Sequence, residues 1–134
     1  MAILPRVLRA GSRKNRGMKH MYRDYAEEIE RKFESARKML ECLNSGSVYQ
    51  ARASIELKKN IESAYASFYY MRAMGCWESV TSTQKLLNSA IDCFQLLRKT
   101  WGYKCNQYFL RVGRCLYDIQ CILNMIEYNE LGVF

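Results

Sequence analysis

The chain has little of what interrupts helices, since its 134 residues include one proline and seven glycines. Because these residues are the strongest breakers of regular structure, their scarcity favours long helices over many short strands. No apolar run approaches the roughly 18 residues that a membrane-spanning helix needs, so we expect no transmembrane segment. The length fits one domain with one hydrophobic core.

Residues typical of catalytic and metal sites are also scarce. His20 is the only histidine, and it lies among basic residues that disfavour its protonation. One histidine cannot supply the two Glu-x-x-His units of a carboxylate di-iron bundle. The sequence has no Cys/His metal spacing and no glycine-rich phosphate loop. We therefore predict a protein that is not an enzyme and has neither a metal nor a cofactor.

The even number of cysteines raises the alternative of a disulfide framework. No pair forms C-x-x-C, and the N-terminus lacks the uninterrupted apolar stretch of a secretory signal. The ten-residue step from Cys105 to Cys115 turns a helix by about 1000°, so these thiols point in different directions. We instead predict reduced cysteines buried in the core. The six are Cys42, Cys76, Cys93, Cys105, Cys115 and Cys121.

Acidic residues are missing from the first 23 positions. Of the 21 lysines and arginines, seven precede Asp24, which leaves 14 in the rest of the chain against all 13 acids. A strongly cationic arm is thus followed by a nearly neutral body. The seven cations are Arg6, Arg9, Arg13, Lys14, Arg16, Lys19 and Arg23.

The body is rich in apolar residues at alternating steps of four and three, which is the pattern of packed helices. One such seam runs from Tyr22 to Leu43, and another runs from Cys105 to Ile126. Four helices of similar length with short connections should alternate in direction. We therefore predict an all-α, up-down-up-down four-helix bundle over residues 18–134, with an arm at residues 1–17. The expected helices cover about residues 18–45, 48–74, 81–101 and 103–128.

Local signals set the expected helix ends. Gly46 and Gly75 suit the left-handed position after a helix C-terminus. Ser47-x-x-Gln50 and Thr81-x-x-Gln84 are capping-box candidates for the second and third helices.

Three packing details follow from the same patterns. Tyr65, Tyr69 and Tyr70 widen the apolar face of the second helix, so we expect them to be buried. Trp77 should cover the core at a short connection. Gly113 inside the fourth helix costs about 1 kcal/mol against alanine, and a close approach between helices would explain it.

The arm has two competing interpretations. Arg6, Arg9, Arg13 and Arg16 share one face of a helix that begins at Pro5, while Ile3, Leu4, Val7 and Leu8 cover another. An amphipathic, arginine-rich and acid-free segment is typical of a mitochondrial transit peptide, which predicts a mitochondrial location. Alternatively, the arm lies along the phosphates of RNA or DNA in a nuclear or cytoplasmic protein. A solvated tail without function is the plainest alternative.

A possible secondary basic patch lies around the third connection. Tyrosines 103 and 108 stand among its cations, so stacking on nucleic-acid bases is conceivable, although such a group is more often an ordinary solvated face. The patch comprises Arg98, Lys99, Lys104, Arg111 and Arg114.

Together these features favour a non-enzymatic structural or accessory subunit of a larger assembly. An organellar ribonucleoprotein or a mitochondrial complex fits best, with the arm as the anchor on RNA or another anionic surface and the bundle contacting other protein subunits. The alternative is a stand-alone RNA- or DNA-binding helical protein, viral or nuclear. Homo-oligomerisation is compatible with either function.

Overall fold

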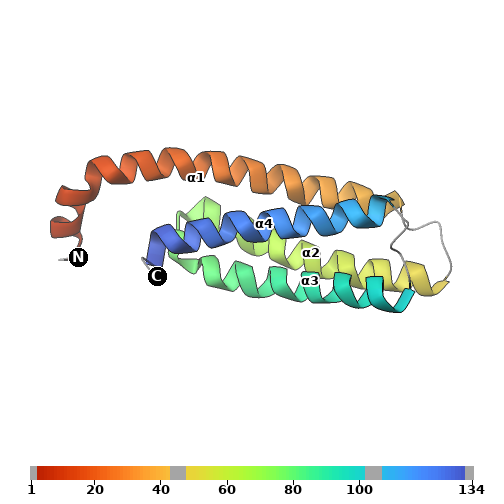
Figure 1. Cartoon of the computed structure of the whole chain (residues 1–134). Coiled ribbons are helices and arrows are strands. Elements are labelled where there is room, and N and C mark those ends of the chain that lie inside the picture. The colour runs from red at the N-terminus through yellow and green to blue at the C-terminus, as the bar shows by residue number, and fades with distance from the viewer. Residues whose placement is uncertain (1–2, 43–47, 102–106, 132–134) are drawn as a thin grey trace.

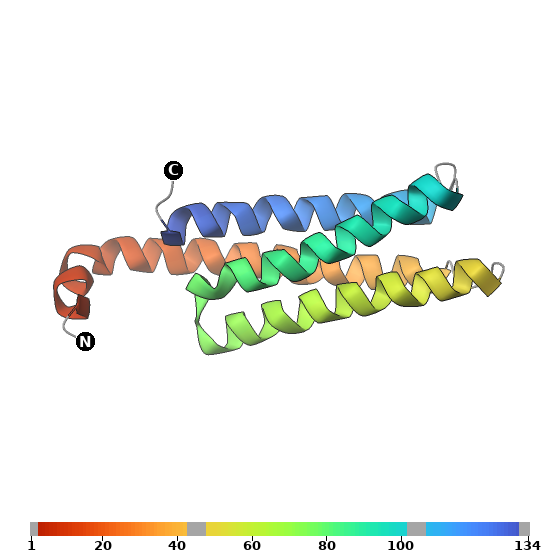
Figure 2. The ribbon, with the colours of Figure 1, turned by 90° about the horizontal axis from the view of Figure 1, so that it is seen from below.

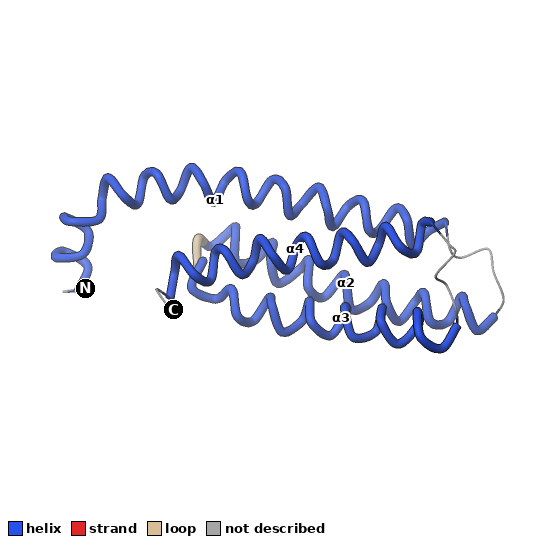
Figure 3. Tube along the Cα trace, viewed as in Figure 1, coloured by secondary structure: helices blue, strands red, loops and turns tan. Residues whose placement is uncertain are grey.

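The computed structural model describes residues 3–42, 48–101 and 107–131, and all regular structure in these ranges is helical (Figure 1 and Figure 3). The elements are α1 (Ile3–Cys42), α2 (Val48–Met74), the short 3-10 helix η1 (Trp77–Ser79), α3 (Val80–Trp101) and α4 (Gln107–Leu131). Successive α-helices run in opposite directions, which confirms the predicted up-down-up-down bundle (Figure 2).

The four helices do not contact one another equally. α1 packs most extensively on α4, and α2 packs most extensively on α3. The contact between α1 and α2 is the smallest among the neighbouring pairs of α-helices. The bundle is therefore two closely packed helix pairs laid side by side, and the seam between α1 and α2 is its most open edge.

The predicted seams form the core. From Tyr22 to Leu40 on α1, every described position of the four-three pattern is buried, and so is every described position from Phe109 to Ile126 on α4. The largest buried side chains come from all four α-helices, and Phe33, Phe68 and Phe94 are among them. Burial of such side chains stabilises the fold by roughly 1.5–3 kcal/mol each.

The turn after α2 confirms the prediction for Gly75. Its φ is 68°, in the left-handed region that favours glycine. The Gly75 N–H donates to the Arg72 carbonyl at 3.2 Å and the Cys76 N–H to the Met71 carbonyl at 3.0 Å, the two bonds of a Schellman motif. η1 follows directly and places Trp77 on the core, 5.0 Å from the Tyr22 ring between centroids. Trp77 thus covers the core as predicted.

Gly113 marks the close approach between α3 and α4. A Cβ at this position would overlap the ring of Phe94, which is itself buried and stacks on Phe109 with centroids 4.4 Å apart. The absence of a side chain at Gly113 is what lets the Phe94 ring lie against α4.

Two predicted helix starts differ from the structure. α1 begins at Ile3 rather than near residue 18, so the arm is a continuation of the first bundle helix. α3 begins at Val80, which places Thr81 inside the helix and not at its N-cap. Because Thr81 lies inside α3, it does not form a capping box with Gln84, whose amide nitrogen donates to two side chains of α4. Gly46, Ser47 and Cys105 lie outside the described residues.

Burial also differs from expectation at several positions. Tyr69 and Tyr70 are 59% and 67% exposed, because no described element covers that side of α2. Cys42 and Cys121 are exposed, whereas Cys115 is buried. All five described cysteines are free thiols. An unpredicted polar contact lies in the core, where the hydroxyls of Ser67 and the fully buried Thr83 are 2.8 Å apart.

Candidate functional site

The cationic residues of the arm lie on the N-terminal half of α1. We call residues 6–23 the cationic segment. In Figure 1 and Figure 2 this half of α1 projects past the end of the bundle, and its first turns bend out of line with the rest of the helix. Arg6, Arg9, Arg13 and Arg16 follow one another at steps of three, four and three, which is the spacing of one helix face. Arg23, where the segment joins the bundle, is exposed.

The secondary basic patch lies at the other end of the molecule. Arg98 and Lys99 are in the last turn of α3, Arg111 and Arg114 are in the first half of α4, and all four are exposed. Tyr108 beside them is 47% exposed. Lys104 and Tyr103 lie outside the described residues. The two basic regions are at opposite ends of the bundle (Figure 1), so they do not form one continuous surface.

The open edge between α1 and α2 forms a groove that the sequence did not predict. It contains two clefts of about 370 and 240 Å³ that share Tyr69. We call this surface the tyrosine groove. Its residues are Glu30, Arg37, Glu62, Tyr65, Tyr69 and Arg72.

Ion pairs bridge the tyrosine groove at two levels. Arg72 donates to Glu30 at 2.5 Å. About two turns of α1 beyond Glu30, Arg37 donates to Glu62 at 2.8 Å and to Glu34 at 2.5 Å. Both arginines are about one-third exposed, so solvent screens these pairs and each contributes at most about 1 kcal/mol.

The tyrosines of the groove differ in how they are held. Tyr65 stacks on the buried Phe33 ring at 4.9 Å and carries the Arg37 guanidinium 5.5 Å above its own ring. Tyr69 meets Tyr65 edge-on at 6.4 Å and turns the rest of its ring toward solvent. Burial raises the pKa of Tyr65, and the nearby Glu30 and Glu34 carboxylates raise it further. The groove therefore presents two tyrosine rings between charged side chains.

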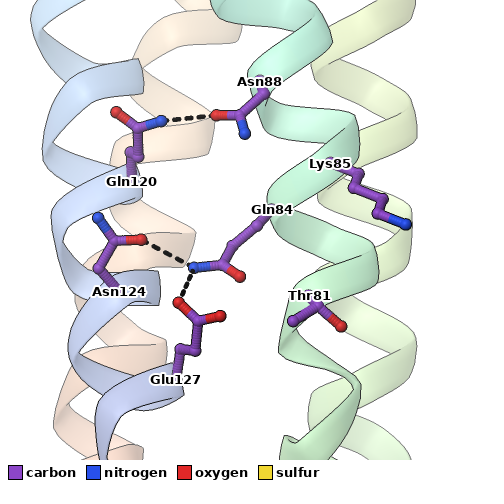
Figure 4. Close-up of a pocket in the computed structure, with 7 residues that line it drawn as sticks. All are labelled: Thr81, Gln84, Lys85, Asn88, Gln120, Asn124 and Glu127. Carbon is purple, nitrogen blue, oxygen red and sulfur yellow. Dashed lines mark hydrogen bonds between the residues drawn. The ribbon is translucent and has the colours of Figure 1, made fainter. Parts of the chain in front are cut away.

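A second surface cleft separates α3 from α4. It measures about 310 Å³ and is lined mostly by uncharged polar side chains. Figure 4 shows Gln120 donating to Asn88 at 2.6 Å, and Gln84 donating to Asn124 at 2.8 Å and to Glu127 at 3.2 Å. We call these four amides the amide seam. Further along the same seam, Gln95 donates to the Tyr117 hydroxyl.

The shifted titratable groups lie in the core and on its margin. Burial raises the pKa of Tyr22, and the hydrogen bond that its hydroxyl donates to Glu130 at 2.6 Å raises it further. Burial also raises the pKa of the Cys93 and Cys115 thiols. All these shifts favour the protonated form of the group. A protonated thiol is a poor nucleophile, so Cys93 and Cys115 are not activated for attack.

Among the residues that the structure describes, no helix combines the length and apolarity that crossing a bilayer requires. Within the same ranges, no three histidine, cysteine or carboxylate side chains gather in a way that could hold a metal ion.

These surfaces offer charged groups, aromatic rings and amide groups for contact with other molecules. The cationic segment suits phosphates, the tyrosine groove suits cations and planar groups, and the amide seam offers paired hydrogen-bond donors and acceptors. Comparisons of the chain with protein-family models, with curated proteins and with solved structures found no match.

Proposed function

We propose that the protein is a non-enzymatic accessory subunit of a larger assembly, and that its cationic segment anchors it by binding RNA. An organellar ribonucleoprotein in the mitochondrion is the setting that fits this function best. The observation that carries the proposal is the distribution of charge along α1. Seven cations and no acid occupy the helix up to Arg23, whereas both signs alternate from Asp24 onward.

The charges on the bundle half of α1 are largely satisfied within the molecule. Lys32 lies 3.0 Å from Asp118, and Arg37 bonds Glu34 and Glu62. Such alternating pairs suit a solvated helix face. The cationic segment contains seven cations and no acid, so it creates a positive field that attracts polyanions.

The helical geometry gives this attraction a direction. Ten residues separate Arg6 from Arg16, which is about 15 Å along a helix. The arginines on this face can therefore contact successive phosphates of a single RNA strand. Because the segment is continuous with α1, the bound strand would be held at one end of the bundle, and the helical body would remain free to pack against protein subunits.

A salt titration of RNA binding tests the proposal. Each phosphate neutralised on a single strand contributes about −0.7 to the slope of log affinity against log salt concentration. Replacing four arginines with glutamine should therefore weaken binding and make the slope shallower by about 3. This four-arginine variant is R6Q, R9Q, R13Q and R16Q combined in the full chain. Fluorescence anisotropy with a labelled single-stranded RNA measures both quantities.

A matched control removes the same number of charges from the bundle. This four-lysine control should bind RNA nearly as the wild type does, because those charges lie outside the cationic segment. It combines K38Q, K58Q, K59Q and K85Q. Equal losses in the two variants would show that net charge alone determines binding, and would contradict the proposal.

A stand-alone nucleic-acid-binding protein is the second candidate, and the exposed secondary basic patch favours it. Arg98, Lys99 and Arg111 lie at the same end of the bundle as the exposed ring of Tyr108 (Figure 1), and an exposed ring among cations suits stacking on bases. If RNA binding survives in the four-arginine variant but fails in R111Q/R114Q, this second function replaces the first. A fluorescent reporter fused to residues 1–23 tests the location, since import supports a mitochondrial protein and nucleolar or diffuse signal opposes it.

A further inference from the structure

We propose that the tyrosine groove binds the arginine face of the cationic segment from a second copy of this chain. Two chains would then exchange their segments in a reciprocal dimer. The chain carries both halves of this contact, a groove of tyrosine rings and paired charges and an arginine-rich helix. The inference goes beyond the proposed function and does not depend on RNA binding.

The groove already holds one guanidinium in the way the proposal requires. Arg37 lies over the Tyr65 ring at 5.5 Å while it donates to Glu34 and Glu62. A guanidinium above an aromatic face and between carboxylates gains both cation–π attraction and charge-assisted hydrogen bonds. The groove is thus chemically suited to arginine.

A second position of the same kind stands open next to the first. Tyr69 follows Tyr65 by one turn of α2, and its ring is 59% exposed beside the larger cleft. The Glu30 carboxylate lines that cleft together with its partner Arg72, and the exposed Glu27 lies one turn earlier along α1. An incoming arginine over Tyr69 would therefore meet Glu27 and would share Glu30 with Arg72.

The arginine face matches the groove in length. On a straight helix, residues 6 to 16 extend about 15 Å, and the stretch of α2 from Tyr65 to Ala73 extends about 12 Å. A chain cannot fill its own groove in this structure, because its segment continues α1 past the end of the bundle (Figure 1 and Figure 2). A second copy offers the same segment, and a two-fold arrangement satisfies both grooves.

Sedimentation velocity of the full chain, without nucleic acid, tests the dimer. At high micromolar concentration the wild type should sediment as a dimer in about 0.05 M salt and as a monomer in about 0.5 M salt, because the added ions screen the contact. A chain that stays monomeric in low salt would overturn the proposal. RNA binding would be unaffected by that result, so the two proposals fail separately.

Two variants then locate the contact. The groove variant combines Tyr69→Ala with Glu27→Gln, and it should weaken the dimer at least about tenfold, as should the four-arginine variant. Tyr69→Phe alone should retain the dimer, because phenylalanine keeps the aromatic ring. The control is Tyr108→Ala, which removes an exposed tyrosine from α4 and should leave the dimer intact. Circular dichroism confirms that each variant keeps its helices.

Mixing the two variants gives the sharpest outcome. The groove variant retains an intact segment, and the four-arginine variant retains an intact groove. An equimolar mixture should therefore associate through one contact, whereas neither variant associates alone. A dimer that persists in either variant, or an equal loss in Tyr108→Ala, would place the interface elsewhere on the molecule and overturn the proposal.

Discussion

The two halves of α1 belong to one continuous helix, yet they differ in apolar pattern and in charge. From Tyr22 to Leu40 the helix places an apolar residue on the core at every step of the four-three pattern and alternates charges of both signs on its other faces. Up to residue 21 it carries cations without acids. One half supplies buried side chains to the core, and the other concentrates positive charge. Helix formation alone therefore does not tell where a domain ends.

The difference separates stability from binding. Substitutions in the bundle should lower the free energy of unfolding, because packing and hydrogen bonds are lost there. Substitutions in the cationic segment should change binding instead. The following predictions test this division, beginning with the largest expected effect.

Phe33→Ala should destabilise the bundle by about 3–5 kcal/mol, because it empties a fully buried site between Tyr65 and Phe68. Tyr70→Ala on the exposed side of α2 is the control and should change stability by less than about 0.5 kcal/mol. Urea unfolding followed by circular dichroism measures both. If the two substitutions cost the same, the buried seam is not where stability resides.

Gly113→Ala should destabilise the bundle by about 1–3 kcal/mol, because the new methyl group overlaps the Phe94 ring. The gain of about 1 kcal/mol in helix propensity is already exceeded by this clash. Phe94 cannot move aside easily, since it is buried and stacked on Phe109.

The double variant Gly113→Ala/Phe94→Leu isolates the clash. Leucine is smaller than phenylalanine, so the alanine should cost less in this background than in the wild type. A double-mutant cycle by urea unfolding gives the coupling energy. An additive cycle would contradict the close approach of α3 and α4.

Tyr22→Phe should cost about 1 kcal/mol near neutral pH, because the hydrogen bond to Glu130 is lost. The raised pKa of Tyr22 also predicts a pH dependence. The folded state keeps the phenol protonated, so this stability is complete below the ordinary tyrosine pKa of about 10 and is lost as pH rises above it.

Alkaline unfolding curves check the sign. Above pH 10 the wild type should lose stability more steeply than Tyr22→Phe, which has no phenol to ionise at this position. The other raised groups, Cys93, Cys115 and Tyr65, add to the alkaline loss in both proteins. Parallel slopes for the two proteins would show that Tyr22 is not responsible.

The smallest expected effect is on the salt dependence of stability, tested at two polar contacts of the bundle. Lys32→Gln removes a partly exposed ion pair with Asp118 between α1 and α4 and should cost under about 1 kcal/mol. That cost should shrink in high salt, because added ions screen the pair. Gln120→Ala in the amide seam should cost a similar amount, unchanged by salt, because its bond to Asn88 joins two neutral groups. Thermal unfolding at two salt concentrations distinguishes them.

The sequence was sufficient to predict the four helices and the buried faces of α1 and α4. The four-three spacing on α1 and α4 identifies the core residues correctly, because periodicity reports which face of a helix is apolar. Gly75 and Gly113 were also interpreted correctly, since each reflects a local requirement of backbone or space.

Features that depend on contacts between residues far apart in the sequence could not be predicted from the sequence. Tyr69 and Tyr70 lie on an apolar flank of α2, but spacing does not reveal that no described helix covers it. Gln84 has the spacing of a capping box, yet Asn124 on α4 offers its amide a tertiary partner. The tyrosine groove and the amide seam arise from such pairings between helices, so no single segment predicts them.

The same limit applies to the cationic segment. Its charge and its helical pattern were visible in the sequence, and the structure adds that it is continuous with α1. RNA binding and the mitochondrial location stay predictions, because they depend on a partner.

The most direct test of the division within α1 is the urea unfolding free energy of the four-arginine variant. The free energy should stay within about 0.5 kcal/mol of the wild-type value, or rise slightly as repulsion between like charges is relieved. A loss of more than about 1 kcal/mol would show that these arginines stabilise the bundle, and would contradict their assignment to a partner.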